Sequence, residues 1–464
     1  MTFLLALLAA AGAASAGSTQ PVTAERNTSC QGALCRAGTL RPYFNKLARA
    51  NAREPGSRPV HILQIGDSHT AGDAITGGWR ELLQAQYGSG GRGVLPPGRP
   101  YQGYLTHGIT ASMTGAWTTA STFGSASQEP RPALGLSGFS LTSASEGASM
   151  GLVADPGQEF DRFVICAQAR PGAGTLNIQM GLSVEQLRLS SHVSHPECRT
   201  VRTDRPQSVV RVTATGGPVT ITSWATFRDS GGVVLSNLGV VGSQLMHFGR
   251  TSDAVIAEEL KAYRPDLVVI AFGTNEGFAP RVSPGEYEIV LRSEIGRIRR
   301  LIGNTPLLIL GAPDANSRNL AHQANAPGVA IDCNVRRQSL NDIVAGLRES
   351  EAAGAGAQTP VTGSDPANRP LFVPPGLGAV QDVQRRVAAD LNIAYWDWEA
   401  RMGGACSAAK KVFAPVPGMR GDFVHFTRSG GWEIGRALQS DLAAAARALS
   451  TQEAGSSAAS AGNH

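Results

Sequence analysis

The sequence predicts an α/β fold, a parallel sheet with helices on both faces, into which an all-β sandwich is inserted. First, continuous apolar runs such as residues 60–65 and 267–272 end abruptly in small-residue turns, as buried parallel strands do. Second, segments with helical periodicity alternate with these runs, which indicates a sheet covered on both sides. Third, residues 101–228 show short alternating runs separated by glycine, proline and serine, a pattern typical of a β-sandwich.

The α/β part begins with an amphipathic segment in which Leu40, Phe44 and Leu47 recur at helical spacing. Helices are expected over 41–53, 79–87, 252–262, 285–302, 339–352, 379–391 and 429–449. Strands are expected over 60–65, 233–241, 267–272, 307–310 and 394–396. Segments on either side of the insert are therefore expected to build one sheet.

The region that we expect to be a sandwich contains five clear strand patterns. They lie at 162–166, 176–180, 184–189, 208–215 and 219–227. Ser149 stands in a G-x-S-x-G match, but a nucleophile elbow needs a strand-to-helix turn, so we expect no catalytic role for it. Residues 88–93 match G-x-G-x-x-G after a helix rather than a strand, which disfavours a dinucleotide site; we expect a mobile loop there.

The chain of 464 residues is long enough for more than one core. Residues 1–16 combine a short apolar run with an Ala-Ser-Ala cleavage pattern, which predicts a signal peptide and export to the periplasm or cell envelope. No segment is long and apolar enough for a stable membrane span. The predicted divisions are signal peptide 1–16, irregular leader 17–37, first hydrolase part 38–100, β insert 101–228, second hydrolase part 229–448 and disordered tail 449–464.

Charge and cysteine content narrow the possible partners. The net charge of +5 is spread without a lysine or arginine cluster, so nucleic acid is not expected as a partner, whereas an anionic surface such as a cell wall is compatible. Six cysteines fit an oxidising compartment and allow fifteen pairings. None has zinc-like spacing, so no metal site is expected. The pairing of nearest neighbours would be Cys30–Cys35, Cys166–Cys198 and Cys333–Cys406.

The chemistry is expected at the end of the first strand of the sheet. Ser68 follows Gly66-Asp67 directly after residues 60–65, and ligands in open α/β sheets collect at that rim. Far downstream, Asp422 precedes His425 by three residues. An imidazole can remove the serine proton near neutral pH, and a carboxylate can orient that imidazole. The hypothesis is therefore a catalytic triad of these three side chains.

Two further positions at strand ends can stabilise a tetrahedral intermediate. Gly242 follows the strand expected at 233–241, and Asn275 follows the strand at 267–272. With the backbone N–H of Ser68, the backbone N–H of Gly242 and the side-chain amide of Asn275 would supply three donors to an oxyanion. Each motif alone is an ordinary turn or helix cap; their order along the chain favours a joint catalytic role.

This set of motifs resembles the SGNH (GDSL-type) hydrolase superfamily. Its blocks correspond to residues 66–68, the glycine at 242, residues 273–276 and residues 422–425. The resemblance implies a flavodoxin-like parallel sheet and a serine esterase that needs no cofactor. Glu276 stands where the family usually has aspartate; that position is not carried over as catalytic.

Within the superfamily, residues 66–73, 396–404 and 422–427 look like those of bacterial peptidoglycan O-acetylesterases. This resemblance implies removal of the O6-acetyl group of N-acetylmuramic acid, a carbohydrate-binding-like insert and an O-acetylated glycan as partner. An O-acetyltransferase of an envelope or exported polysaccharide and a non-catalytic glycan-binding protein remain alternatives. The sequence leaves the oligomeric state open.

Several other side chains near these motifs have two interpretations. His69 and Asp73 lie close to the nucleophile and are expected to stabilise its turn and the first helix.

Four aromatic residues of the insert either stack on sugar rings or form the core, and the core is favoured for any one of them. They are Trp117, Phe123, Trp224 and Phe227. Trp117 and Trp224 are candidate substrate-binding residues.

Overall fold

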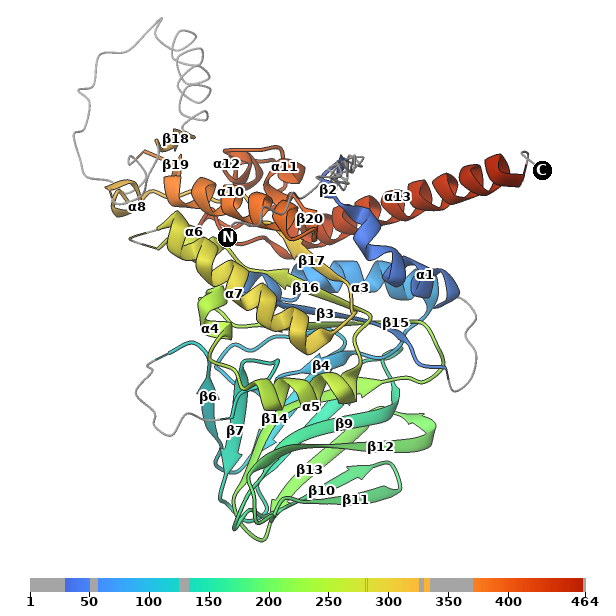
Figure 1. Cartoon of the computed structure of the whole chain (residues 1–464). Coiled ribbons are helices and arrows are strands. Elements are labelled where there is room, and N and C mark those ends of the chain that lie inside the picture. The colour runs from blue at the N-terminus through green and yellow to red at the C-terminus, as the bar shows by residue number, and fades with distance from the viewer. Residues whose placement is uncertain are drawn as a thin grey trace, which may run out of the picture.

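The computed structural model combines an α/β layer with two antiparallel sheets beneath it (Figure 1). It describes residues 30–50, 57–124, 133–279, 281, 283–324, 329–333 and 370–461. The expected signal peptide and the helix expected over 339–352 lie outside these residues. Among the helices described, none is long and apolar enough to cross a membrane.

A seven-stranded sheet forms the centre of the α/β layer, in the order β1-β2-β20-β17-β16-β3-β15. Five consecutive strands, from β20 to the edge strand β15, are mutually parallel. They are β3 (Val60–Gly66), β15 (Val233–Gly239), β16 (Leu267–Ala271), β17 (Leu307–Leu310) and β20 (Ala394–Trp396). The predicted parallel α/β sheet is thus confirmed. Within it, β3 and β15 pair although the antiparallel strands lie between them in the sequence.

The edge of this sheet corrects the prediction of an irregular leader for residues 30–37; residues 17–29 of that leader lie outside the described residues. A hairpin of β1 (Cys30–Gln31) and β2 (Leu34–Cys35) is closed by the Cys30–Cys35 disulfide and pairs antiparallel with β20. Two-residue strands carry too little sequence pattern to be recognised. Their pairing with β20 and the disulfide hold them in place instead.

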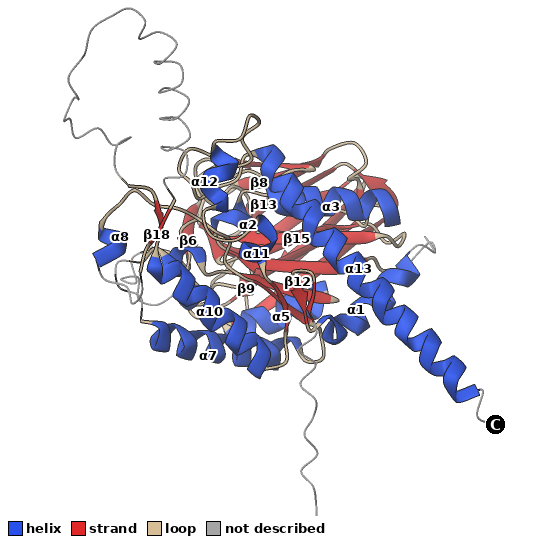
Figure 2. Cartoon of the chain, turned by 90° about the horizontal axis from the view of Figure 1, so that it is seen from above, coloured by secondary structure: helices blue, strands red, loops and turns tan. Residues whose placement is uncertain are grey.

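Helices cover both faces of the sheet. The helices are η1 (Ala37–Leu40), α1 (Arg41–Arg49), α2 (Ser68–Ala71), α3 (Ala74–Tyr87), α4 (Leu245–Phe248), α5 (Asp253–Tyr263), α6 (Thr274–Gly277), α7 (Pro284–Ile302), α8 (Ala321–Ala324), α10 (Pro375–Asp390), α11 (Trp398–Met402), α12 (Ser407–Val412) and α13 (Arg428–Ala461). In β3, Ile62 packs toward the side of α1, α3 and α13, whereas Leu63 packs toward α5, α7 and α10. Successive side chains of a strand point to opposite faces, so β3 contributes to both cores. Figure 2 shows α7 and α10 side by side.

Helix α13 corrects the prediction of a disordered tail from residue 449, because its backbone continues to Ala461 and extends beyond the body (Figure 1). Residues 452–454 are glutamine, glutamate and alanine, which have high helix propensity, and four alanines lie among the glycine and serines of 454–461. Composition alone suggested disorder, but these residues extend a helix that has already begun on the sheet.

Residues 93–124 and 133–227, together called the β region, form two antiparallel sheets. One has the order β11-β10-β13-β8-β5, and the other β12-β9-β14-β7-β6 with β4 also paired to β14. The strands are β4 (Gly93–Leu95), β5 (Ile109–Thr114), β6 (Thr118–Ser121), β7 (Phe139–Ser143), β8 (Ser149–Ala154), β9 (Phe160–Ala169), β10 (Thr175–Met180), β11 (Ser183–Arg188), β12 (His195–Gln207), β13 (Val209–Thr215) and β14 (Val219–Phe227). Ser149 thus begins a strand. Pairing of β4 with β14 starts this region before residue 101.

The centre of the second of these sheets is buried on both faces. Every residue of β14 is buried; Trp224 packs in the core between the two antiparallel sheets, while Ala225 and Phe227 pack in the α/β core. The sheet is therefore shared between two cores. Removal of the β region would expose one face of the α/β core to water, so the two regions do not form separable domains.

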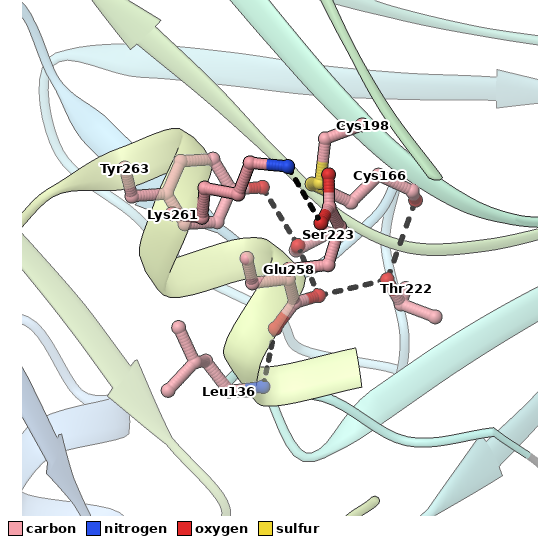
Figure 3. Close-up of a disulfide and its surroundings, with 9 residues drawn as sticks. Leu136, Cys166, Cys198, Thr222, Ser223, Glu258, Lys261 and Tyr263 are labelled. Carbon is pink, nitrogen blue, oxygen red and sulfur yellow. Dashed lines mark hydrogen bonds and ion pairs between the residues drawn. A yellow bond between two sulfur atoms is a disulfide. The ribbon is translucent and has the colours of Figure 1, made fainter. Parts of the chain in front are cut away.

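Helix α5 joins the two regions beside a disulfide (Figure 3). Glu259 is fully buried and accepts hydrogen bonds from Leu136 N, Thr222 Oγ1 and Ser223 Oγ at 2.6, 2.7 and 2.5 Å. Burial raises the pKa of this carboxyl, although its three donors oppose that shift. Each of the three disulfides joins a cysteine to the next cysteine along the chain, as the nearest-neighbour pairing predicts; the other two are Cys166–Cys198 and Cys333–Cys406.

Candidate active site

Ser68 is the first residue of α2, immediately after β3 ends at Gly66. The side chain of Asp67 caps this helix by accepting a hydrogen bond from His69 N at 2.9 Å. As the first helical residue, Ser68 has a backbone N–H without an intrahelical acceptor. A Cβ at Gly66 would lie 2.3 Å from Thr70 Oγ1, so only glycine permits this sharp turn.

Ser68, His425 and Asp422 form one hydrogen-bonded series across 357 residues of sequence. The distance from Ser68 Oγ to His425 Nε2 is 2.9 Å, and the distance from His425 Nδ1 to Asp422 Oδ2 is also 2.9 Å. Because a carboxylate only accepts, Nδ1 carries a proton and donates it to Asp422. Nε2 of the neutral imidazole is then free to accept the Ser68 hydroxyl proton, as a general base does.

The loop that carries Asp422 and His425 is held in an uncommon backbone conformation. Phe423, between them, has φ of 61°, which is left-handed for a non-glycine residue. This turn lets Oδ1 of Asp422 accept the backbone N–H groups of Val424 and His425 at 3.0 and 2.9 Å. Burial acts to raise the pKa of Asp422, but these donors and the imidazole outweigh it, so the pKa is lowered.

His69 connects the two halves of the site. Its Nδ1 lies 3.3 Å from Asp67 Oδ1, and its Nε2 lies 2.9 Å from the carbonyl of Val424. Burial disfavours the imidazolium, but the hydrogen bond and charge of Asp67 outweigh it and the pKa of His69 is raised. Its ring also packs beside His425, with ring centres 5.5 Å apart. The sequence predicted only a role in the turn; the contact with Val424 comes from the fold.

A buried charge network lies beneath the nucleophile turn. Asp73 is fully buried and accepts from Arg80 Nη2 at 2.7 Å and Arg92 Nη2 at 3.0 Å. Asn237 donates to the carbonyl of Thr70 at 3.0 Å. Burial alone would raise the pKa of Asp73, but the two guanidinium groups hold it well below its usual value. The predicted mobile loop at 88–93 is wrong, because Arg92 is buried in this network.

Gly242 and Asn275 lie in neighbouring loops at the rim. Gly242 has φ of 76°, and a Cβ there would lie 3.1 Å from the ring of Phe123; both facts require glycine. The amide of Asn275 donates to the carbonyl of Ser243 at 2.9 Å, which fixes the side chain beside the Gly242 turn. Gln244 donates back to the carbonyl of Asn275 at 3.1 Å. The two loops therefore hold each other.

Glu276 joins the same two loops from below. One carboxylate oxygen accepts from Leu245 N at 2.8 Å, and the other accepts from Gly273 N at 3.0 Å. Burial raises the pKa of this carboxyl to about 7. Glu276 therefore ties the segment at Leu245 to the segment at Gly273.

A pocket of about 280 Å³ opens over Ser68 and His425. Its walls also contain side chains that the sequence did not single out, from residues 101–105, the turn at 241 and the segment before Asp422. They include Tyr101, Leu105, Val241 and Arg420. Neither an apolar tyrosine–leucine segment nor a lone arginine has a motif, so sequence reasoning had no signal for them. Within the described residues, no group of three or more His, Cys, Asp or Glu side chains could hold a metal ion.

The aromatic residues of the β region divide between core and surface. Trp224 and Phe227 are buried at 0% and 1% exposure, so the prediction of Trp224 as a sugar-binding residue is wrong; both sheet faces there are covered. Trp117 is half-buried, and its indole N–H donates to the carbonyl of Thr114 at 3.0 Å. Phe123 is 47% exposed and lies against Gly242.

Comparison with known proteins adds to this description. No family model matches the chain, and no curated protein matches it. A solved structure described as "Peptidoglycan O-acetylesterase in action, 5 min" superposes with a TM-score of 0.66 at 23% identity, covering 90% of this chain and 100% of that one. A putative GDSL-like lipase from Parabacteroides merdae superposes with a TM-score of 0.27 at 13% identity, covering 45% of this chain and 72% of that one. A family two carbohydrate esterase from Cellvibrio japonicus superposes with a TM-score of 0.25 at 11% identity, covering 73% of this chain and 100% of that one.

The first of these likenesses is one of fold over nearly the whole length of both chains. At 23% identity, it shows that this chain shares the fold of that structure.

Proposed function

We propose that the protein is a serine esterase that removes O-acetyl groups from a cell-envelope glycan, at O6 of N-acetylmuramic acid in peptidoglycan. The observation that carries this proposal is the hydrogen-bonded series of Asp422, His425 and Ser68 at the edge of a pocket. The likeness of fold to a peptidoglycan O-acetylesterase structure supports the choice of glycan.

In the proposed reaction, Ser68 Oγ attacks the acetyl carbonyl carbon while its proton passes to His425 Nε2. The oxyanion accepts hydrogen bonds from the N–H groups of Ser68 and Gly242 and from the amide of Asn275. The sugar oxygen leaves with the proton from His425, and Ser68 remains acetylated. Water then attacks the acetyl group and gives a proton to His425; acetate leaves, and the proton returns to Ser68 Oγ.

We further propose that the enzyme acts after export, in the periplasm or cell envelope. The three disulfides suit an oxidising compartment, and residues 1–16 have the pattern of a signal peptide. The two antiparallel sheets are proposed to form an inserted carbohydrate-binding-like sandwich, with Trp117 as a candidate contact. Their loops at 101–105 also form a wall of the pocket over Ser68.

The decisive experiment measures acetate released from O-acetylated peptidoglycan and from acetylated xylan by the wild-type protein and by Ser68→Ala. We expect faster release from peptidoglycan, and at least a ~10³-fold loss in the variant. Equal release by both proteins would remove Ser68 as the nucleophile. Faster release from xylan would overturn the choice of peptidoglycan.

The same assay distinguishes the two alternatives. Deacetylated glycan is added as an acceptor, and acetyl groups on it are counted against free acetate. Transfer that exceeds release would identify an acetyltransferase. Binding to peptidoglycan without hydrolysis of p-nitrophenyl acetate would identify a non-catalytic glycan-binding protein.

A further inference from the structure

A second cavity, of about 550 Å³, lies beside the catalytic pocket. Its volume falls within the range of about 300–1,000 Å³ that is common for ligand sites. Helix α3, the loop at 105–108 and the segment at 420–432 contribute residues to both cavities. Leu105, for example, lines the catalytic pocket, and the next two residues line the second cavity. The two cavities are therefore neighbours along these shared segments.

The walls of the second cavity come from both regions of the molecule. Helix α3 supplies Glu81 and Gln84, the β region supplies His107 and Gln158, and the start of α13 supplies Arg428 and Trp432. Gln158 bridges the regions by donating from its amide nitrogen to Gln84 Oε1 at 2.8 Å. Because the β region shares a core with the α/β layer, these walls are held in a fixed relation.

The lining of this cavity offers several acceptors to a ligand. Glu81 and Asp155 present exposed carboxylates. Nδ1 of His107 lies 3.1 Å from the Asp73 carbonyl and must donate to it, which leaves Nε2 of the neutral ring as an acceptor. Two arginines also line the cavity. Arg80 is buried and donates to Asp73 at 2.7 Å, whereas Arg428 lies 5.7 Å from the centre of the half-buried Trp432 ring. Because Arg80 is engaged by Asp73, the carboxylates of Glu81 and Asp155 face one further cation, and the lining suits a ligand with hydroxyl and amide donors and one apolar face better than an anionic one.

We propose that this cavity binds a neighbouring sugar unit of the same glycan whose acetyl group enters the catalytic pocket. This inference rests on the proposed function and assigns a second subsite to it. The ligand class is a neutral N-acetylated amino sugar, whose hydroxyl and amide groups face the carboxylates and glutamines while its apolar face lies toward Trp432. The exposed carboxylates of Glu81 and Asp155 argue against the acidic stem peptide as the occupant.

The test measures binding of peptide-free glycan strands to the Ser68→Ala protein, so that turnover does not interfere. Glu81→Ala and Arg428→Ala are each introduced into it, because both side chains are exposed and lie outside the buried networks. Glu433→Ala is the matched control. This residue lies on α13, as Arg428 does, is exposed and does not line the cavity. We expect at least a five-fold weaker affinity for the two cavity variants and no change for the control.

In otherwise wild-type protein, the ratio of kcat/KM on the polymer to kcat/KM on p-nitrophenyl acetate should fall at least five-fold in the same two variants. Wild-type affinity in both variants would overturn the proposal, as would an equal loss in Glu433→Ala. Binding only of strands that retain their peptides would make the stem peptide the occupant and would also overturn it. If the wild-type protein releases no acetate from peptidoglycan, the proposed function fails, while the binding assay still decides on the cavity.

Discussion

The two halves of the catalytic site are built in opposite ways. Ser68 stands on a turn supported by Asp73 and Arg92, whose side chains are fully buried, whereas Asp422 and His425 lie on a loop with side chains 46% and 37% exposed. A buried ion pair with satisfied hydrogen bonds holds one geometry, because breaking it leaves an uncompensated charge. The serine half is therefore fixed by the fold, and the histidine half depends on a few hydrogen bonds at the surface.

The largest effect on rate is expected from Asp422→Asn, which tests the exposed half directly. The variant keeps an oxygen for the N–H groups of Val424 and His425 but places an amide against His425 Nδ1. The imidazole then adopts the tautomer that cannot accept the Ser68 proton, and kcat should fall on the order of 10³–10⁴-fold. Steady-state hydrolysis of p-nitrophenyl acetate measures the fall in kcat. A loss below ten-fold would show that the exposed carboxylate does not orient the ring.

Asn275→Ala tests the proposed oxyanion donor in the half of the site that carries Ser68. Removal of one oxyanion donor typically costs ~10²–10³ in kcat, and this donor is held by the carbonyl of Ser243. Gln244→Ala is the matched control, because it removes a hydrogen bond between the same two loops without removing a proposed donor. Equal losses in the two variants would mean that loop position, and not the amide, explains the effect.

In both halves of the site, the sequence predicted the features that leave a signal within one segment. Apolar runs and the turns after them predicted the parallel sheet and the positions of Ser68 and Asn275, because burial and turn chemistry leave local signals. His425 and Asp422 were recognisable from their spacing and their resemblance to a family. These signals are local, and each describes one segment.

Features that depend on contacts between distant segments were not predictable. Trp224 lies in an alternating strand pattern that looks the same whether the second face is open or covered, and here both faces are covered. Arg92 looked like part of a mobile glycine loop because its partner Asp73 lies on another element. The tails were misjudged for a similar reason: β1 and β2 are set by pairing with β20, and α13 continues a helix anchored elsewhere.

His69→Gln is expected to have a smaller effect, because it loosens the exposed half without removing a reacting group. His69 is a positioning residue that holds the Val424 carbonyl next to the nucleophile turn. Loss of a hydrogen bond worth about 1.4 kcal/mol would lower the aligned fraction, and therefore kcat, about ten-fold, with little change in KM. The burst amplitude with a p-nitrophenyl ester counts competent sites. His322→Gln, a half-buried histidine outside the pocket, is the control. An unchanged kcat would place the alignment of His425 elsewhere.

The last comparison lies within the buried half, where Asp73 has two arginine partners and Glu276 has only backbone N–H donors. Burial therefore raises the pKa of Glu276 to about 7 from an ordinary value of 4.5. The folded state binds this proton more tightly than the unfolded state, so the stabilisation is complete below pH 4.5 and is lost as pH rises through 7.

Glu276→Gln lacks this titration, so the free energy of unfolding of the wild-type protein relative to the variant should fall by up to about 3 kcal/mol between pH 4.5 and 8. Urea unfolding at several pH values measures the difference, and groups common to both proteins cancel. Glu286→Gln changes an exposed carboxylate and should show no such trend. A difference that stays constant with pH would mean that Glu276 is already ionised in the folded protein at pH 4.5, held as a carboxylate by its two N–H donors alone.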